Sequence, residues 1–142
     1  MRRAITLIET LAAIAILALE TGAFAIGLAG AGARARITEA VGAVRDMDQL
    51  ARSLSQTDGE LALRHDDHRV SLLRQSEWRV GRLAQRPLPR AIEVSLEQSA
   101  TAVDTIWFDR FGRCQDYTVH IRGPGHVVGL QVSGLTGWME EW

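Results

Sequence analysis

The sequence predicts an α+β protein, in which a long N-terminal helix, membrane-spanning in its first half and amphipathic in its second, packs on an antiparallel β-domain. Three patterns in the 142 residues indicate this class. An apolar run with few charges opens the chain, apolar residues then recur every three or four positions, and after Gly59 they alternate with polar ones. The first two patterns are typical of helices and the third of strands. We expect a short basic segment at 1–4, a spanning helix at 5–33, its amphipathic continuation at 34–57 and a β-domain at 58–142.

The apolar run from Ala4 to Gly32 is long enough to cross a bilayer. Its only charges are Glu9 and Glu20. About 20 apolar residues, at ~1.5 Å of rise each, cross a hydrocarbon core ~30 Å thick. Arg2 and Arg3 precede the run, which by the positive-inside tendency places the N-terminus in the cytoplasm and the β-domain outside it. A cleaved secretory signal is the competing interpretation, but its apolar region normally spans only ~7–15 residues.

The start of this run resembles the N-terminus of type IV pilins and type II secretion pseudopilins. The resemblance rests on Ile5-Thr6-Leu7-Ile8-Glu9 and on the apolar stretch 11–18 that follows. In that superfamily a prepilin peptidase removes a short basic leader and N-methylates the new first residue. A glutamate four residues further on pairs with the N-terminal amine of a neighbouring subunit.

The resemblance implies a leader peptide at 1–4, cleavage between Ala4 and Ile5, an N-methylated Ile5, and Glu9 as the residue that pairs subunits. The family usually has glycine before the cut and phenylalanine after it, whereas this chain has alanine and isoleucine. The alternative is an ordinary signal anchor with a stray acid.

A second acid, Glu20, lies eleven residues after Glu9. Eleven helical steps of ~100° return it to within about 20° of the same face, roughly 16 Å further along the axis. We expect Glu20 to meet a partner charge in an assembled complex. The alternative is a protonated, silent carboxyl group whose pKa is raised by desolvation.

The amphipathic part of the helix has one apolar stripe. The stripe is spaced at three and four residues and consists of Ile37, Val41, Val44, Met47, Ala51 and Leu54. Charged residues take the other positions, among them Glu39, Arg45, Asp46, Asp48 and Arg52. This pattern favours a helix that buries one face. Because no break precedes it, we expect one continuous helix from about Ile5 to Gln56, stopped by Gly59 in a left-handed C-cap.

The remainder of the chain reads as short strands separated by turns. The expected strands are 60–64, 69–74, 77–83, 92–96, 103–109, 117–121 and 128–132. Pro87 and Pro89 interrupt the succession, since proline removes a backbone donor from a sheet. Regular strand–turn alternation of this kind predicts an antiparallel β-domain.

The C-terminal half resembles the GspH/FimT-type minor pseudopilins. The residues that carry this likeness are Ile106–Gly112, the alternating segments 117–121 and 127–132, and the terminal Thr136-Gly137. The resemblance implies a minor pseudopilin, a structural subunit with an assembly or tip role in the pseudopilus of a type II protein-secretion system, rather than an enzyme. Its implied partners are other pseudopilins, the prepilin peptidase and the inner-membrane assembly platform. The implied location is the bacterial inner membrane, with a single pass and a periplasmic β-domain.

Other functional classes have weaker support. A minor type IV pilin that binds DNA is the alternative function, but the net charge is −1 and the only local basic cluster is Arg79, Arg82, Arg86 and Arg90. The polar run His65-Asp66-Asp67-His68 contains metal-ligand residue types, yet it reads as a solvated turn between strands. Cys114 with His120 or His126 could form a nucleophile and base, but no orienting acid follows by motif. We expect no cofactor and no metal.

Overall fold

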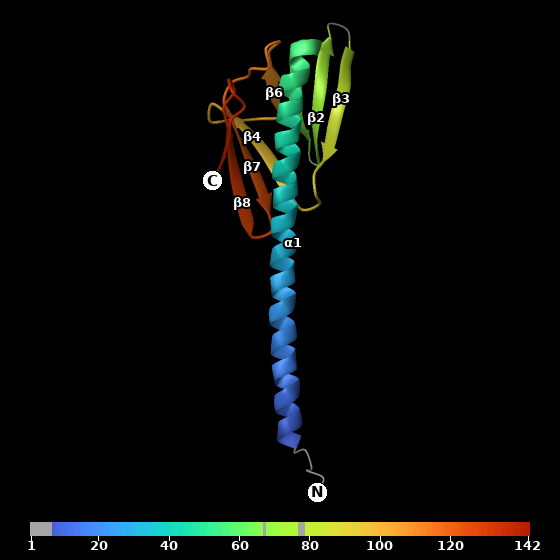
Figure 1. Cartoon of the computed structure of the whole chain (residues 1–142), viewed down its shortest axis with the longest axis vertical. Helices are drawn as coiled ribbons and strands as arrows, with labels where there is room; N and C mark the ends of the chain where they lie inside the picture. Colours follow the sequence, from blue (N-terminus) through green and yellow to red (C-terminus); the bar gives the residue numbers. More distant parts are fainter. Residues whose placement is uncertain (1–6, 67, 77–78) are drawn as a thin grey trace. The chain divides into compact units, whose positions relative to one another are not determined.

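The computed structural model describes residues 7–66, 68–76 and 79–142, without the side chains of 7–9, 22–29, 75–76 and 79–80. The chain divides into two compact units, Met1–Gly32 and Ala33–Trp142. A single helix, α1 (Leu7–Asp58), runs through 52 residues and belongs to both (Figure 1). All of the strands belong to the second unit.

The predicted fold class is wrong in its membrane-spanning half. No helix in the described part of the chain is long and apolar enough to cross a bilayer. The described side chains in the first half of α1 cover residues 10–21, and this stretch contains the charged Glu20.

In the second unit, α1 buries one stripe along its length. The stripe follows helical spacing and comprises Ala33, Ile37, Ala40, Val41, Val44, Met47, Asp48, Ala51 and Ser55. The helix ends where the backbone turns left-handed at Gly59, which has φ of 87°. The amide of Gly59 donates to the carbonyl oxygen of Ser55 at 3.0 Å, so a helical carbonyl that would otherwise be unpaired is satisfied.

The strands form two separate antiparallel sheets, a division that the alternating pattern did not reveal. The four-stranded sheet has the order β3-β2-β1-β6. Its strands are β1 (Leu61–Asp66), β2 (Arg69–Ser76), β3 (Arg79–Pro87) and β6 (Thr105–Phe108). The pairing of β2 with β3 shifts register between Leu72 and Leu73. Pro87 is tolerated because it ends β3, an outer strand of the sheet.

The five-stranded sheet has the order β5-β4-β7-β8-β9. Its strands are β4 (Glu93–Gln98), β5 (Thr101–Val103), β7 (Tyr117–Gly123), β8 (His126–Val132) and β9 (Met139–Glu141). In β7 the alternation is complete, since Tyr117, Val119 and Ile121 are buried while the residues between them are partly exposed. The sheet therefore presents one apolar face to the core.

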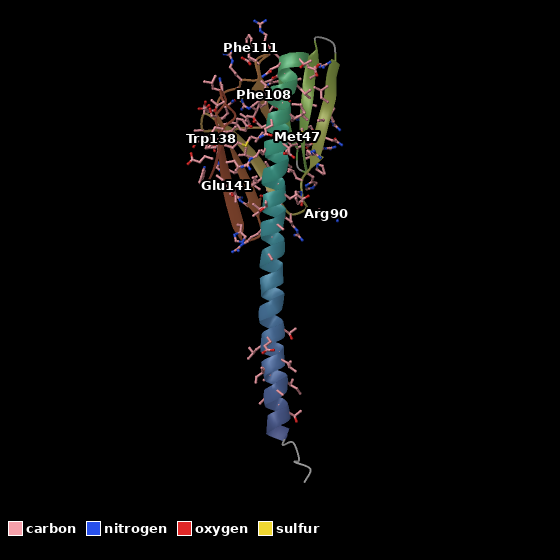
Figure 2. All side chains as sticks on the ribbon, in the orientation of Figure 1. Met47, Arg90, Phe108, Phe111, Trp138 and Glu141 are labelled. Carbon is pink, nitrogen blue, oxygen red and sulfur yellow. The ribbon has the colours of Figure 1, made fainter. Side chains whose placement is uncertain are left out.

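The core lies where the helix stripe meets both sheets. Within the second unit, Figure 1 shows β2 and β3 on one side of α1 and β4, β7 and β8 on the other. One cluster of buried side chains joins the three layers, with Met47 from α1, Leu61 and Ile106 from the four-stranded sheet and Val119 from the five-stranded sheet. Figure 2 shows Met47 midway along this part of the helix.

Candidate assembly surfaces

The residues predicted to direct processing and assembly lie in the first unit. Ala4 and Ile5 lie outside the described residues, and Glu9 lies in α1 with its side chain outside the description. Glu20 is exposed on the helix. The structure therefore places Glu20 at a surface, and the predicted role of Glu9 stays a prediction.

The described side chains of the first unit form a helix segment with no buried face. Residues 10–21 are all exposed. Five large apolar side chains on this segment have exposed fractions between 57% and 74%: Leu11, Ile14, Ile16, Leu17 and Leu19. At ~100° per residue they point in directions spread around the whole helix axis. A helix that is apolar on every side is ordinarily buried against other structure.

In the second unit, a polar network fastens α1 to two loops. Arg52 lies one helical turn after Asp48, and its Nε donates to Asp48 Oδ2 at 2.8 Å. The Asp48 carboxylate is fully buried, and it also accepts a hydrogen bond from Tyr117 Oη at 2.8 Å. One buried acid thus joins the helix to β7 as well as to its own neighbour on α1.

The guanidinium of Arg52 reaches the loops that follow β6 and β8. Its Nη1 donates to the carbonyl oxygens of Gly112 at 3.0 Å and Gly134 at 2.8 Å, and its Nη2 donates to that of Ser133 at 3.2 Å. Gly112 lies so close that an added Cβ would come within 2.8 Å of the Arg52 backbone oxygen. The arginine therefore sets the positions of both loops relative to the helix.

Electrostatics agree with a structural role for this network. Burial alone would lower the pKa of Arg52, but its hydrogen bond to Asp48 and the Asp48 charge raise it above the usual value. Burial, and then the charge of Asp48, raise the pKa of Tyr117 well above its usual value. Both groups therefore keep their protons, and the hydrogen bonds that they donate persist at neutral pH.

The sequence interpretation missed this network, because it placed Asp48 and Arg52 on the polar side of the helix. The structure buries Asp48 completely and Arg52 in large part. The available signal was the acid–arginine spacing of four residues next to Met47 and Ala51, which are both buried. An acid–arginine pair next to a buried stripe can be buried at the edge of the core when the two charges satisfy each other.

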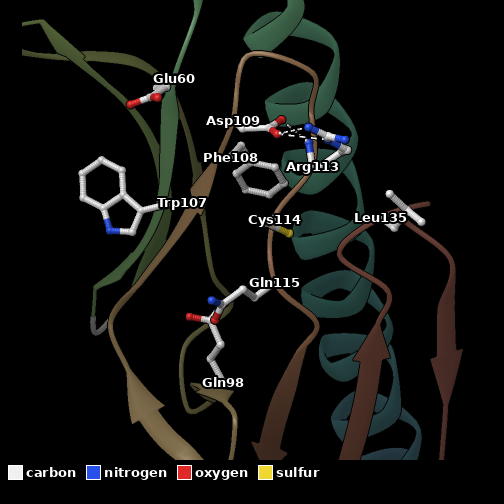
Figure 3. A pocket seen from close by; sticks show the side chains of 9 residues that line it. All are labelled: Glu60, Gln98, Trp107, Phe108, Asp109, Arg113, Cys114, Gln115 and Leu135. Carbon is white, nitrogen blue, oxygen red and sulfur yellow. Dashed lines mark hydrogen bonds and ion pairs between the residues drawn. The ribbon is translucent and has the colours of Figure 1, made fainter.

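A shallow groove lies between the β6 edge and the loops that Arg52 holds. Its volume is about 670 Å³, and its lining includes Trp107, Asp109, Arg113, Cys114 and Leu135 (Figure 3). The Asp109 carboxylate accepts hydrogen bonds from two backbone amides and from the guanidinium of Arg113. These bonds hold the turn that lies at one end of the groove. The side chains that line the groove do not place a nucleophile next to a base.

The alternative pairing of Cys114 with a histidine is not present in the structure. Burial raises the pKa of the Cys114 thiol to about 11, so the thiolate that a nucleophile requires is scarce at neutral pH. The Cys114 sulfur contacts Arg52 Nη2 at 3.6 Å, whereas His120 Nε2 lies 3.3 Å from Glu97 Oε2. The two side chains thus have different partners.

No three His, Cys, Asp or Glu side chains in the described ranges are grouped so that they could hold a metal ion. Comparison of this chain with protein families, with curated proteins and with solved structures finds no match.

Proposed function

We propose that this chain is a structural subunit of a helix-packed filament, of the minor pseudopilin kind that serves type II secretion. The observation that carries the proposal is the segment 10–21, which exposes large apolar side chains in all directions. Apolar surface on this scale is unfavourable in water at about 25 cal/mol per Å². Helices of neighbouring subunits would supply the missing cover.

The resemblance at the N-terminus suggests how such a subunit is processed. Ile5 would be the mature N-terminus, and Glu9 would pair with the terminal amine of a neighbour. Glu20 would then lie on the surface that meets other subunits. The remaining predicted partners are major and minor pseudopilins, the prepilin peptidase and the assembly platform, and the inner-membrane location stays a prediction that cell fractionation would test.

The second unit supports a structural rather than a catalytic role. Among its described residues, the buried charged network centred on Asp48 and Arg52 has its hydrogen-bonding groups occupied by the protein itself. A network that is satisfied in this way holds loops in place and leaves no activated group for a substrate. The β-domain would accordingly serve as a displayed module of the filament.

N-terminal processing gives the most direct test. Intact-mass and N-terminal analysis would compare the protein from cells with and without the prepilin peptidase. We expect loss of residues 1–4 and one added methyl group on Ile5, only when the peptidase is present. An uncut N-terminus, or a cut after Ala31, would refute the proposal.

Assembly can be tested with a matched pair of variants. Glu9→Gln should reduce cross-linking of the chain to neighbouring pseudopilins, because it removes the charge that pairs with the amine. Glu39→Gln removes one exposed acid from the second half of α1 and should leave cross-linking unchanged. Equal cross-linking by both variants would remove the assigned role of Glu9.

A further inference from the structure

Charge is divided between the two sheets of the second unit. The strands of the four-stranded sheet carry six arginines and one aspartate, whereas those of the five-stranded sheet carry four glutamates and one arginine. The whole chain nevertheless has a net charge of only −1. The second unit is therefore electrically two-sided, basic on one sheet and acidic on the other.

Most charged side chains on the strands other than β3 and β9 are paired within the chain. The ion pairs are Arg64–Asp104, Arg69–Asp66, Arg74–Asp58 and Arg122–Glu93, and Glu97 Oε2 lies 3.3 Å from His120 Nε2. Four exposed charges on the outermost strands have no oppositely charged partner among the described residues. They are Arg82 and Arg86 on β3 and Glu140 and Glu141 on β9.

These unpaired charges lie on strands that end their sheets. β3 lies at one edge of the four-stranded sheet, with β6 at the other, and β9 lies at one edge of the five-stranded sheet, with β5 at the other. Figure 1 shows β3 on one side of α1 and the C-terminal end of the chain on the other, and Figure 2 shows Glu141 on the side away from β3. Each edge exposes backbone donors and acceptors as well as its charges.

We propose that copies of this chain associate head to tail, with the basic β3 edge of one copy against the acidic β9 edge of the next. The inference rests on the proposed filament role and assigns it a second contact, made by the β-domain. Two β3 edges, or two β9 edges, would bring like charges together, and that juxtaposition is strongly unfavourable. The charges thus select the head-to-tail pairing over a symmetric one.

The arrangement of the edges determines the kind of assembly. The two contacting surfaces are different and lie on opposite sides of the unit, so the interface is heterologous. Each added copy uses one edge and leaves the other free. Such an interface repeats from copy to copy, and it gives an open helical row, the geometry of a filament, when the rotation between copies does not close a ring.

A second copy explains more than a polyanion such as DNA would. A polyanion would fit Arg82 and Arg86, but it would leave Glu140 and Glu141 without a role. A second copy of the chain uses both edges at once and satisfies all four charges. Charge complementarity therefore favours self-association.

A charge-exchange experiment tests the interface in the full chain, held in a mild non-ionic detergent. Variant Arg82→Glu/Arg86→Glu has two acidic edges, and variant Glu140→Arg/Glu141→Arg has two basic edges. Each variant by itself should self-associate at least about tenfold more weakly than the wild type at low salt. A mixture of the two should associate again, since each basic edge meets an acidic one. Sedimentation and energy transfer between labelled variants would measure this.

The control variant Arg36→Glu/Arg45→Glu makes the same change in net charge at exposed positions of α1. It should associate like the wild type. The proposal is overturned if Arg82→Glu/Arg86→Glu associates normally, if the mixture is no tighter than its components, or if the variant loses only binding of a DNA duplex. Contact through residues 10–21 would persist in every variant, so failure here is distinguishable from failure of the filament proposal.

Discussion

Two parts of α1, residues 10–21 and residues 30–58, are both helical but differ in what their apolar side chains contact. The first part exposes apolar side chains on all sides, and the second buries one stripe and exposes most of its charges. Leu17 is 62% exposed, whereas Met47 is 1% exposed. Both parts are helical because both avoid proline and contain good helix formers.

The two parts of α1 differ in the source of their stabilisation. The second part finds its apolar partners in the sheets of its own chain. The first part has no such partners among the described residues, and the proposed function assigns their cover to neighbouring subunits. Under that proposal, one helix carries both a segment that stabilises the fold and a segment that takes part in assembly.

The largest expected effect comes from breaking the buried network. Asp48→Ala leaves Arg52 and the Tyr117 hydroxyl without their shared acceptor, so it should lower the free energy of unfolding by about 3–5 kcal/mol. Urea unfolding would measure the change. Asp46→Ala, an exposed acid two residues earlier, should stay within about 0.5 kcal/mol of the wild type. Similar losses in both variants would contradict the assigned role of Asp48.

A smaller effect is expected from truncating apolar side chains in the two parts of the helix. Met47→Ala should cost about 2–4 kcal/mol of unfolding free energy, because it leaves a cavity in the core. Leu17→Ala should change that free energy by less than about 0.5 kcal/mol. It should instead weaken self-association, measured by sedimentation. Equal stability losses would show that residues 10–21 already have a partner within the chain.

The smallest effect concerns alkaline pH. The pKa of Cys114 is raised to about 11 by burial, above its usual 9.0, so the unfolded thiol loses its proton before the folded one does. The folded state then binds more protons, and stability should fall as pH rises from about 9 to about 11. Cys114→Ala should flatten the fall between pH 9 and 10. Tyr117, whose pKa is also raised, should still contribute above pH 10. An unchanged slope in Cys114→Ala would contradict the burial of the thiol.

Much of the local structure was predictable from periodicity. Alternation identified β4, β7 and β8, and the three-and-four spacing identified the stripe of α1 that packs on the core. Gly59 was expected to end the helix and does so with a positive φ. These features depend on the side chains of neighbouring residues, which the sequence lists directly.

Predictions from the sequence pattern were wrong where the burial of a residue depends on contacts far away in the chain. The pattern assigned Asp48 and Arg52 to the polar face, because their burial depends on Tyr117 and on the carbonyls of Gly112 and Gly134. Hydropathy also overestimated the first half of the helix as a membrane span, a prediction that the described residues contradict. Spacing alone does not show which polar groups will be satisfied by partners far away in the chain.

Hydrophobic periodicity was sufficient to locate the helix stripe and the main strands, because it depends on residues only a few positions apart. The sequence also determined the apolar character of residues 10–21. Three features became visible only in the folded chain. The strands form two sheets, a buried ion pair links the helix to two loops, and unpaired charges of opposite sign lie on β3 and β9. Those features arise from contacts between residues far apart in the chain, and the local sequence pattern does not reveal such contacts.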